Sequence, residues 1–174
     1  INALMFDPRG GEVLDFFGGQ SDLRNHILRH TSAAFVEDPL RVLRGMQFAA
    51  RFDLQAAPET LALCRSIQGS YVELAVERVW EEWPKWAEKS AAPSRGLHFL
   101  AATGWVELFP EISALIGTPQ DPEWHPEGAV FIHTGHCLDA LVTLPGWLGA
   151  DAESKAVFSL AVLAHDFAKP QTTH

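Results

Sequence analysis

The sequence predicts a mainly α protein that opens with a short β-hairpin and continues as a helical body. Two short apolar stretches, 3–7 and 12–17, flank the turn sequence PRGG, a pattern typical of a hairpin. Apolar residues recur at helical spacing from residue 40 onward. A stretch rich in Pro, Gly and Asp at 117–130 then interrupts the helical pattern. We therefore expect three parts, which cover residues 1–30, 31–116 and 117–174.

The expected helices follow the hairpin in order. A short helix is expected from Asp22 to about residue 29. Asp38 and Pro39 suit the N-cap and first position of a helix that runs to about residue 52, because Asp accepts backbone N–H bonds and proline needs none there. Pro84 predicts a kink or split in its helix, and Pro110 separates two short helices. The remaining helical segments are expected at about 58–68, 74–90, 93–103, 105–115, 132–144 and 153–168.

Composition indicates a folded protein of a reducing compartment. Apolar residues make up 47% of the chain, enough for a buried core. Cys64 and Cys137 have no partner at metal or redox spacing, which favours a cytoplasmic protein with both cysteines in the core. No apolar run of 18 residues and no signal-peptide pattern is present, so no membrane contact is expected. The start at Ile1, without Met, leads us to expect a piece of a longer protein.

Charge is distributed unevenly along the chain. The net charge of −9 by itself disfavours a nucleic-acid partner. All nine arginines, however, precede residue 96, where eleven basic residues nearly balance thirteen acidic ones. The remainder holds two lysines and nine acids. Because arginine is a preferred donor to phosphates and base edges, we expect nucleotide contacts in the first half.

Three tryptophans recur at helical spacing in the segment 74–90. Trp80, Trp83 and Trp86 are expected to share one helix face. Packing between helices is favoured over stacking on RNA bases, because a helical body buries such aromatic faces.

Asp38, Arg41 and Arg44 recur at i, i+3 and i+6 and are expected to share one face of the helix start. Cytosine and adenine each present an amino donor beside a ring-nitrogen acceptor. A carboxylate accepts the amino hydrogen and a guanidinium donates to the ring nitrogen, whereas guanine and uracil present the reverse order. Asp38 with Arg41 is thus a candidate device for selecting C and A, and Arg44 is a candidate phosphate contact. The alternative from spacing alone is an N-cap with ordinary surface ion pairs.

The segment 7–52, DPRGGEVLDFFGGQSDLRNHILRHTSAAFVEDPLRVLRGMQFAARF, resembles the class II tRNA nucleotidyltransferase/poly(A) polymerase family. Its glycines, its acids and the run EDPLRVLR match that family's pattern, and the leading INA resembles the end of its RRDFTINA motif. In AVERVWEE the resemblance implies that Arg78 supports the nucleotide-binding helix, and an ion pair of Arg78 with Glu81 is the alternative. The residues for which the resemblance implies nucleotide binding are Asn2, Asp38, Arg41, Arg44 and Arg78.

The same resemblance gives a meaning to the three expected parts. Residues 1–30 would be the end of a nucleotidyltransferase head, 31–116 a nucleotide-selecting and RNA-binding neck and body, and 117–174 the start of an HD domain. The family's GSxxRD strand and the carboxylates that hold Mg²⁺ are expected to precede this chain. We therefore expect no catalytic residue of nucleotidyl transfer here and no CCA addition by the purified 174-residue chain alone.

The stretches HPEGAVFIHT (125–134) and AHDFAKPQTTH (164–174) resemble the HD module of bacterial-type tRNA nucleotidyltransferases. The resemblance implies a divalent-metal site with phosphatase or cyclic-phosphodiesterase activity. Its last aspartate is expected beyond His174, Ala129 replaces the usual acid of HPEGD, and His125 is the best spare ligand. Buried, hydrogen-bonded histidines are the alternative. The implied metal ligands are His133, His165 and Asp166.

The leading interpretation is tRNA 3′-end maturation by template-independent addition of C and A from CTP and ATP. The resemblance covers enzymes that add all of CCA, only CC or only A. Three alternatives stay open: a poly(A) polymerase of the same superfamily, an HD-type metal-dependent phosphohydrolase with an attached helical domain, and an RNA-binding body without chemistry of its own. The acidic balance after residue 96 disfavours the last of these.

Overall fold

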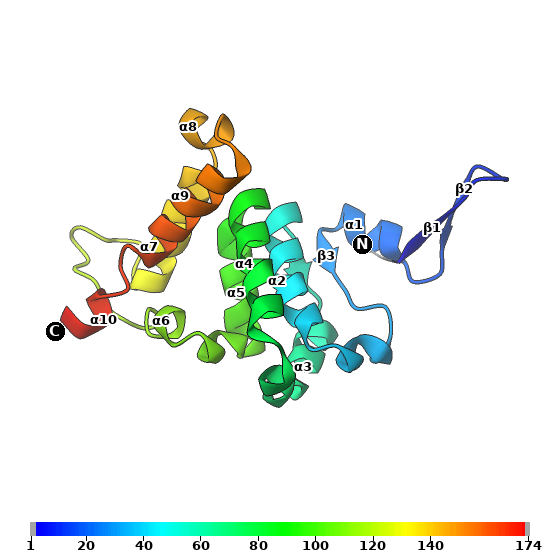
Figure 1. The fold of residues 1–174 in the computed structure, drawn as a ribbon, viewed down its shortest axis with the longest axis horizontal. Coiled ribbons are helices and arrows are strands. Elements are labelled where there is room, and N and C mark those ends of the chain that lie inside the picture. The colour runs from blue at the N-terminus through cyan, green and yellow to red at the C-terminus, as the bar shows by residue number, and fades with distance from the viewer. Residues whose placement is uncertain (1–2, 173–174) are drawn as a thin grey trace.

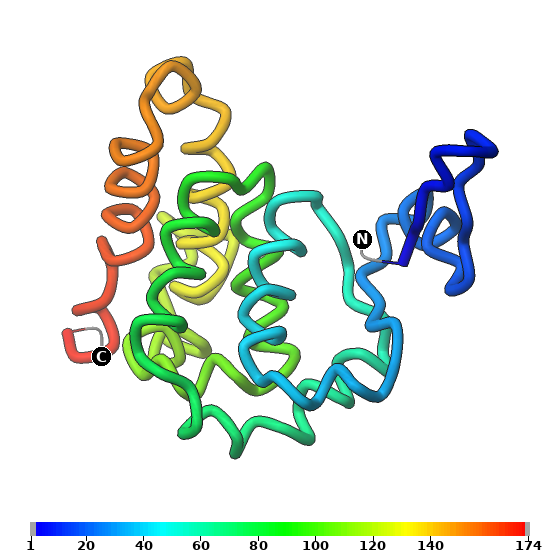
Figure 2. The backbone as a smooth tube through the Cα atoms, turned by 45° about the vertical axis from the view of Figure 1, so that its right-hand side comes forward, coloured from blue at the N-terminus to red at the C-terminus, as the bar shows by residue number. Residues whose placement is uncertain are grey.

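The computed structural model describes residues 3–172 and confirms a mainly α fold with a short N-terminal hairpin. Strands β1 (Leu4–Asp7) and β2 (Glu12–Asp15) pair antiparallel, with Leu4 opposite Asp15. Gly11 closes the turn at a φ of 69°, which residues with a side chain rarely adopt. The hairpin projects from one end of the molecule, and the helices of the C-terminal third lie at the other end (Figure 1). Figure 2 shows the same separation from a second direction.

A two-residue parallel bridge follows the hairpin and corrects one prediction. Helix α1 (Gly19–Arg24) ends before residue 29, and strand β3 (Ile27–Leu28) takes the place of its expected last turn. The cause is His26, whose left-handed φ of 56° turns the chain away from the helix. Strand β3 pairs with β4 (Gln55–Ala56), and the Gln55 N–H donates to the His26 carbonyl at 2.8 Å. The expected helix to residue 29 is therefore wrong beyond Arg24.

Three helices form the centre of the molecule: α2 (Leu40–Phe52), α4 (Val76–Lys89) and α5 (Pro93–Thr103). Helix α4 continues through Pro84, so the split expected there is absent. Proline removes only one backbone N–H donor, so one hydrogen bond of the helix is missing. Burial of Trp83 and Trp86, on either side of Pro84, stabilises the helix despite this loss. The side chains almost fully excluded from solvent in this centre include Leu43, Met46, Trp86, Leu97 and Leu100.

The tryptophan face of α4 is divided between core and surface. Trp86 and Trp83 are buried, which confirms helix packing, whereas Trp80 is 57% exposed. Trp86 Nε1 donates to the Pro93 carbonyl at 3.2 Å and lies directly against Gly96 of α5. Because Gly96 has no side chain, α5 approaches both α4 and α2 closely at this point.

Short elements surround the three central helices. The 3₁₀ helix η1 (Ala33–Glu37) precedes α2, and helix α3 (Pro58–Ser66) and the 3₁₀ helix η2 (Gln68–Glu73) lie between α2 and α4. Helix α5 ends at Gly104, whose φ is 76°, as expected for a helix-terminating glycine. The elements η3 (Trp105–Leu108) and α6 (Pro110–Ser113) confirm two short helices separated at Pro110.

The C-terminal third adds α7 (Val130–Leu141), α8 (Pro145–Leu148), α9 (Ala152–Ala164) and α10 (Lys169–Thr172). Helix α7 packs on α5 and α9 packs on α4, and their buried residues join the same core. The single-turn helices α8 and α10 were not predicted, and the helix expected at 153–168 ends at Ala164. Asp151 caps α9 by accepting the Ser154 N–H at 2.8 Å. Within residues 3–172, no helix is long and apolar enough to cross a membrane.

Candidate nucleotide and metal sites

The candidate nucleotide-binding residues lie at the start of α2 and fall into two groups. Arg41 and Arg44 line a cavity of about 400 Å³, whereas Asp38 faces the start of α4. Asp38 Oδ1 accepts the Leu40 N–H at 3.2 Å, and its backbone carbonyl accepts the Arg41 N–H at 3.0 Å. Asp38 therefore stabilises the helix start while its carboxylate remains half-buried and within reach of α4.

Arg78, at the start of α4, reaches across to Asp38. Its Nη2 lies 3.1 and 3.2 Å from the two carboxylate oxygens. The Arg78 side chain is 51% exposed, so the pair adds little to stability, about 0.2–1 kcal/mol. The alternative pair of Arg78 with Glu81 is not formed among the described residues, where Glu81 instead lies 3.9 Å from Lys85. The main effect of the Arg78 contact is to fix the direction of the Asp38 carboxylate.

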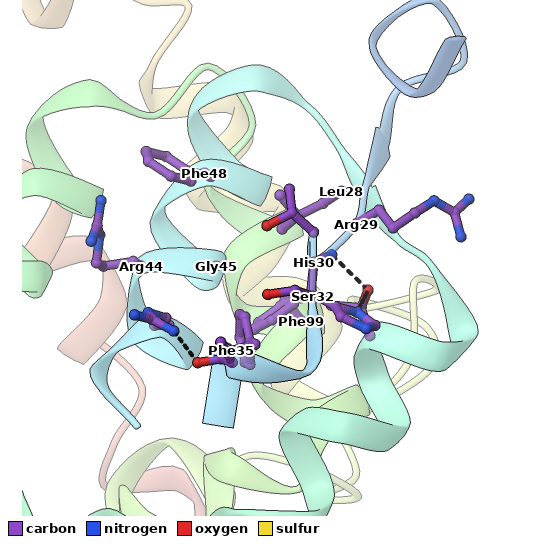
Figure 3. Close-up of a pocket in the computed structure, with 13 residues that line it drawn as sticks. Leu28, Arg29, His30, Ser32, Phe35, Arg44, Gly45, Phe48 and Phe99 are labelled. Atoms are coloured by element: carbon purple, nitrogen blue, oxygen red, sulfur yellow. Dashed lines mark hydrogen bonds between the residues drawn. The ribbon is translucent and has the colours of Figure 1, made fainter. Parts of the chain in front are cut away.

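The cavity beside Arg41 and Arg44 lies between α2 and the segment 28–35 (Figure 3). Arg41 donates to the Ala34 carbonyl of η1, and the Arg44 guanidinium lies 5.9 Å from the centre of the Phe48 ring. Two guanidinium groups beside aromatic rings suit an anionic group attached to a flat aromatic one. Apolar spacing does not distinguish core aromatics from cavity walls, so the sequence did not point to three of the lining residues: Phe35, Phe48 and Phe99.

The cavity lacks the acids that Mg²⁺ requires. Within residues 3–172, both groups of side chains with metal-ligand spacing include His133, which lies on α7. No such group lies beside Arg41 and Arg44 in that part of the chain. The described residues therefore do not fit the Mg²⁺ of nucleotidyl transfer. Asn2, the remaining candidate for nucleotide binding, lies outside the described residues.

A second candidate site begins with His133 on α7. Its Nδ1 lies 2.6 Å from Glu127 Oε1, so its Nε2 faces the end of α9. Glu127 Oε1 also lies 3.1 Å from Nδ1 of His125, the expected spare ligand. Hydrogen bonds from its own backbone N–H and from the two histidines lower the pKa of Glu127 to about 2. A carboxylate that stays ionised holds both imidazole rings in a fixed orientation.

His165 and Asp166 follow α9 and lie opposite His133. The Nδ1 atom of His165 donates to the Val162 carbonyl at 2.6 Å, which leaves Nε2 free, 3.2 Å from Asp166 Oδ2. The Asp166 Oδ2 atom lies 4.0 Å from His133 Nε2 and 2.8 Å from Lys169 Nζ. The structure therefore brings His133, His165 and Asp166 together at one point.

Cys137 was expected in the core, and its position differs from that expectation. It is only partly buried, and its Sγ lies 3.3 Å from Nε2 of His133, one helical turn earlier. The i, i+4 spacing of these two residues was the available signal in the sequence. Cys64 is fully buried as expected, and His136 is exposed. His174 lies outside the described residues.

Curated proteins similar to this chain include multifunctional CCA proteins. The chain is 42% identical over 175 residues to the multifunctional CCA protein of Nitrosococcus oceani and 43% identical over 178 residues to that of Vibrio vulnificus. Each alignment covers 99% of this chain and 41% of the relative, so the chain spans about two-fifths of their length. No protein-family profile matches.

Solved structures with the same fold include a CCA-adding enzyme in complex with CTP, with a TM-score of 0.59 at 24% identity. The match covers 93% of this chain and 37% of that enzyme. The Thermotoga maritima CCA-adding enzyme complexed with tRNA gives a TM-score of 0.58 at 23% identity over 93% of this chain and 38% of that one. At this level of identity, these two likenesses establish the fold.

Proposed function

We propose, from the premise that this chain is homologous to the multifunctional CCA proteins over nearly its whole length, that it selects C and A during tRNA 3′-end maturation. The protein it belongs to would add these nucleotides from CTP and ATP without a template. The observation that carries the proposal is an alignment over 99% of the chain, which includes the segment where α2 directs Arg41 and Arg44 into one cavity.

In this proposal Asp38 and Arg41 read the base and Arg44 binds a phosphate. The Asp38 carboxylate accepts the exocyclic amino group of C or A, and Arg78 fixes its direction without occupying every acceptor position. Arg41 uses one of its five N–H donors on Ala34, which leaves others for the ring nitrogen. Uracil and guanine would place a donor against Arg41 and an acceptor against Asp38 and would be rejected.

The division into head, neck with body, and HD domain is part of the same proposal. The hairpin (within 1–30) would belong to the head, residues 31–116 to the neck and body, and residues 117–174 to the HD domain. Mg²⁺ supplies charge stabilisation for the triphosphate in nucleotidyl transfer. Because the described residues do not offer its ligands, no step of transfer is assigned to them.

The test uses the full-length product of the gene that encodes this chain. It is incubated with tRNA lacking the CCA end and one nucleoside triphosphate at a time. Incorporation of C and A, without U or G, is expected. Asp38→Asn should lose this preference, because an amide presents both a donor and an acceptor to the base. Long adenylate tails would instead identify a poly(A) polymerase.

A matched control lies at the other end of α2. Asp53 also forms an ion pair with an arginine, Arg95, at 2.7 Å, and both side chains are partly exposed. Asp53→Asn should leave the preference for C and A unchanged, since Asp53 lies away from the cavity of Arg41 and Arg44. If Asp38→Asn kept the wild-type preference, the base-reading role would be wrong.

A second function is favoured by the convergence of His133, His165 and Asp166. Imidazole and carboxylate ligands together suit a divalent transition metal, and such a metal supplies an activated water for phosphate ester hydrolysis. We propose that the protein also hydrolyses phosphate monoesters or 2′,3′-cyclic phosphates at this site. Hydrolysis should be lost in His165→Ala while incorporation of C and A persists. Absence of hydrolysis with every divalent metal would refute this second function.

A further inference from the structure

Potential ligand atoms of three residues meet where α7 faces the end of α9. Cys137 Sγ lies 3.3 Å from His133 Nε2, and one ligand atom each of His133, Cys137 and His165 lie within 4.8 Å of one another. Asp166 Oδ2 lies 3.2 Å from His165 Nε2 and 4.0 Å from His133 Nε2. Zinc bond lengths of about 2.0–2.3 Å give edges of about 3.3–3.6 Å in a tetrahedral site. Two of the separations, 3.2 and 3.3 Å, are close to those of such a site, and the 4.0 Å between Asp166 Oδ2 and His133 Nε2 is longer.

The buried oxygen of Asp166 points independently to a missing ligand. The residue is only 7% exposed, and among the described residues no group forms a hydrogen bond of good geometry to Oδ2. Lys169 Nζ lies 2.8 Å away and supplies opposite charge, without a hydrogen bond to this atom. A buried carboxylate oxygen without a hydrogen bond is costly, so a cation at this point would relieve that cost.

Both imidazole rings already present the nitrogen that a metal would need. Glu127 holds Nδ1 of His133, and the Val162 carbonyl holds Nδ1 of His165. Each contact leaves Nε2 facing the cluster, an arrangement typical of metal-binding histidines with a fixed outer partner. Glu127 itself is committed to two histidines, which makes it an outer partner of the site and not a ligand.

We propose that Cys137 is a metal ligand and that it joins His133 and His165, beside Asp166, in a site for a thiophilic divalent ion of the Zn²⁺ class. This inference rests on the metal site proposed above and adds to it one ligand and a class of metal. A thiolate with two imidazoles favours Zn²⁺ or Co²⁺ over Mg²⁺, which prefers oxygen ligands.

Binding through sulfur has a defined proton balance. The metal–sulfur bond replaces the S–H bond of Cys137, and the thiol proton leaves to the buffer. Binding should therefore weaken as the pH falls, because protons compete with the metal for the thiolate.

The test is titration of the chelator-treated chain with Co²⁺, followed by absorption spectroscopy. One equivalent should produce the visible bands of tetrahedral Co²⁺ and the near-ultraviolet band of charge transfer from thiolate to Co²⁺. Cys137→Ala should abolish the charge-transfer band and weaken binding by more than the roughly 10–100-fold that loss of an outer partner causes. Cys64→Ala is the matched control, because Cys64 is fully buried and cannot reach the cluster.

Each outcome has a defined meaning. Co²⁺ bound without the thiolate band, or a band retained in Cys137→Ala, would overturn the role of Cys137 and leave the histidine–aspartate site standing. Failure to bind one equivalent of Co²⁺ or Zn²⁺ would overturn both. If Cys137→Ala does not fold, X-ray absorption of the Zn²⁺-loaded wild-type chain decides the question. One sulfur at about 2.3 Å supports the proposal, and a shell of nitrogen and oxygen alone contradicts it.

Discussion

Replacement of Gly96 by alanine tests how α5 is held against α2 and α4. A Cβ at this position would lie 2.7 Å from Trp86 Nε1, 2.9 Å from Trp86 Cδ1 and 3.0 Å from the Met46 carbonyl oxygen. Neither the Trp86 indole nor the Met46 carbonyl can move easily. The carbonyl belongs to the α2 backbone, and the indole is fully buried and bonded to the Pro93 carbonyl. We therefore expect the new methyl group to move α5 or to displace Trp86 from its hydrogen bond.

One favourable and two unfavourable contributions set the expected change in the free energy of unfolding. Alanine has a helix propensity about 1 kcal/mol more favourable than glycine. Overpacking of a core costs about 1–3 kcal/mol. A Trp86 N–H buried without its acceptor costs a further 1–3 kcal/mol or so. Central values give a net loss of about 3 kcal/mol in the free energy of unfolding, or a fall in Tm of roughly 6–12 °C for a chain of this size.

The assay is urea denaturation of the purified chain, followed by circular dichroism. Gly146→Ala in α8 is the control, because no atom lies within 4 Å of its added Cβ. That variant should be unchanged or more stable by up to about 1 kcal/mol. A stability of Gly96→Ala equal to or above that of Gly146→Ala would show that the close approach of α5 carries no packing constraint.

Three further predictions concern single side chains. Arg78→Ala should change the free energy of unfolding by less than about 1 kcal/mol, yet reduce the preference of the full-length protein for C and A over U and G; unchanged preference would contradict its positioning role. The Ser154 N–H lowers the pKa of Asp151 below its usual 3.8, so the cap of α9 stabilises the fold above that pH and is lost as pH falls through the lower folded pKa. Asp151→Ala should therefore be less stable than wild type at neutral pH, with the gap closing in acid by thermal denaturation. Glu127→Gln should weaken Co²⁺ binding by about 10–100-fold, because His133 loses its ionised partner, and equal affinity would argue against that role.

Local signals in the sequence predicted the features that depend on neighbouring residues. The hairpin turn at Gly11 and the helix start after Asp38 both follow from side-chain chemistry within a few residues. The ion pair of Asp38 with Arg78 could not be predicted in this way, because the two residues are 40 positions apart. An acid closer to Arg78 in the sequence, Glu81, was the simpler candidate for its partner. A left-handed residue other than glycine, such as His26, also has no strong sequence signal.

Local signals in the sequence were insufficient at the candidate sites for the same reason. The histidines and Asp166 of the metal cluster were found from a motif, whereas Cys137 was assigned to the core because its helix is apolar. Only the packing of α7 against α9 shows that one side of this helix lines a polar cluster. Likewise, the arginines of α2 were identified, but the aromatic walls of their cavity come from segments that meet only after folding.

The bridge between β3 and β4 makes residues 27–56 a closed ring. The chain enters and leaves this ring at one place, where the Ala57 N–H also donates to the Leu28 carbonyl at 3.0 Å. The ring contains α2, η1 and the three arginines that line the cavity, Arg29, Arg41 and Arg44. The two ends of the segment that carries Arg41 and Arg44 are therefore held together by backbone hydrogen bonds, independently of the hairpin that precedes it.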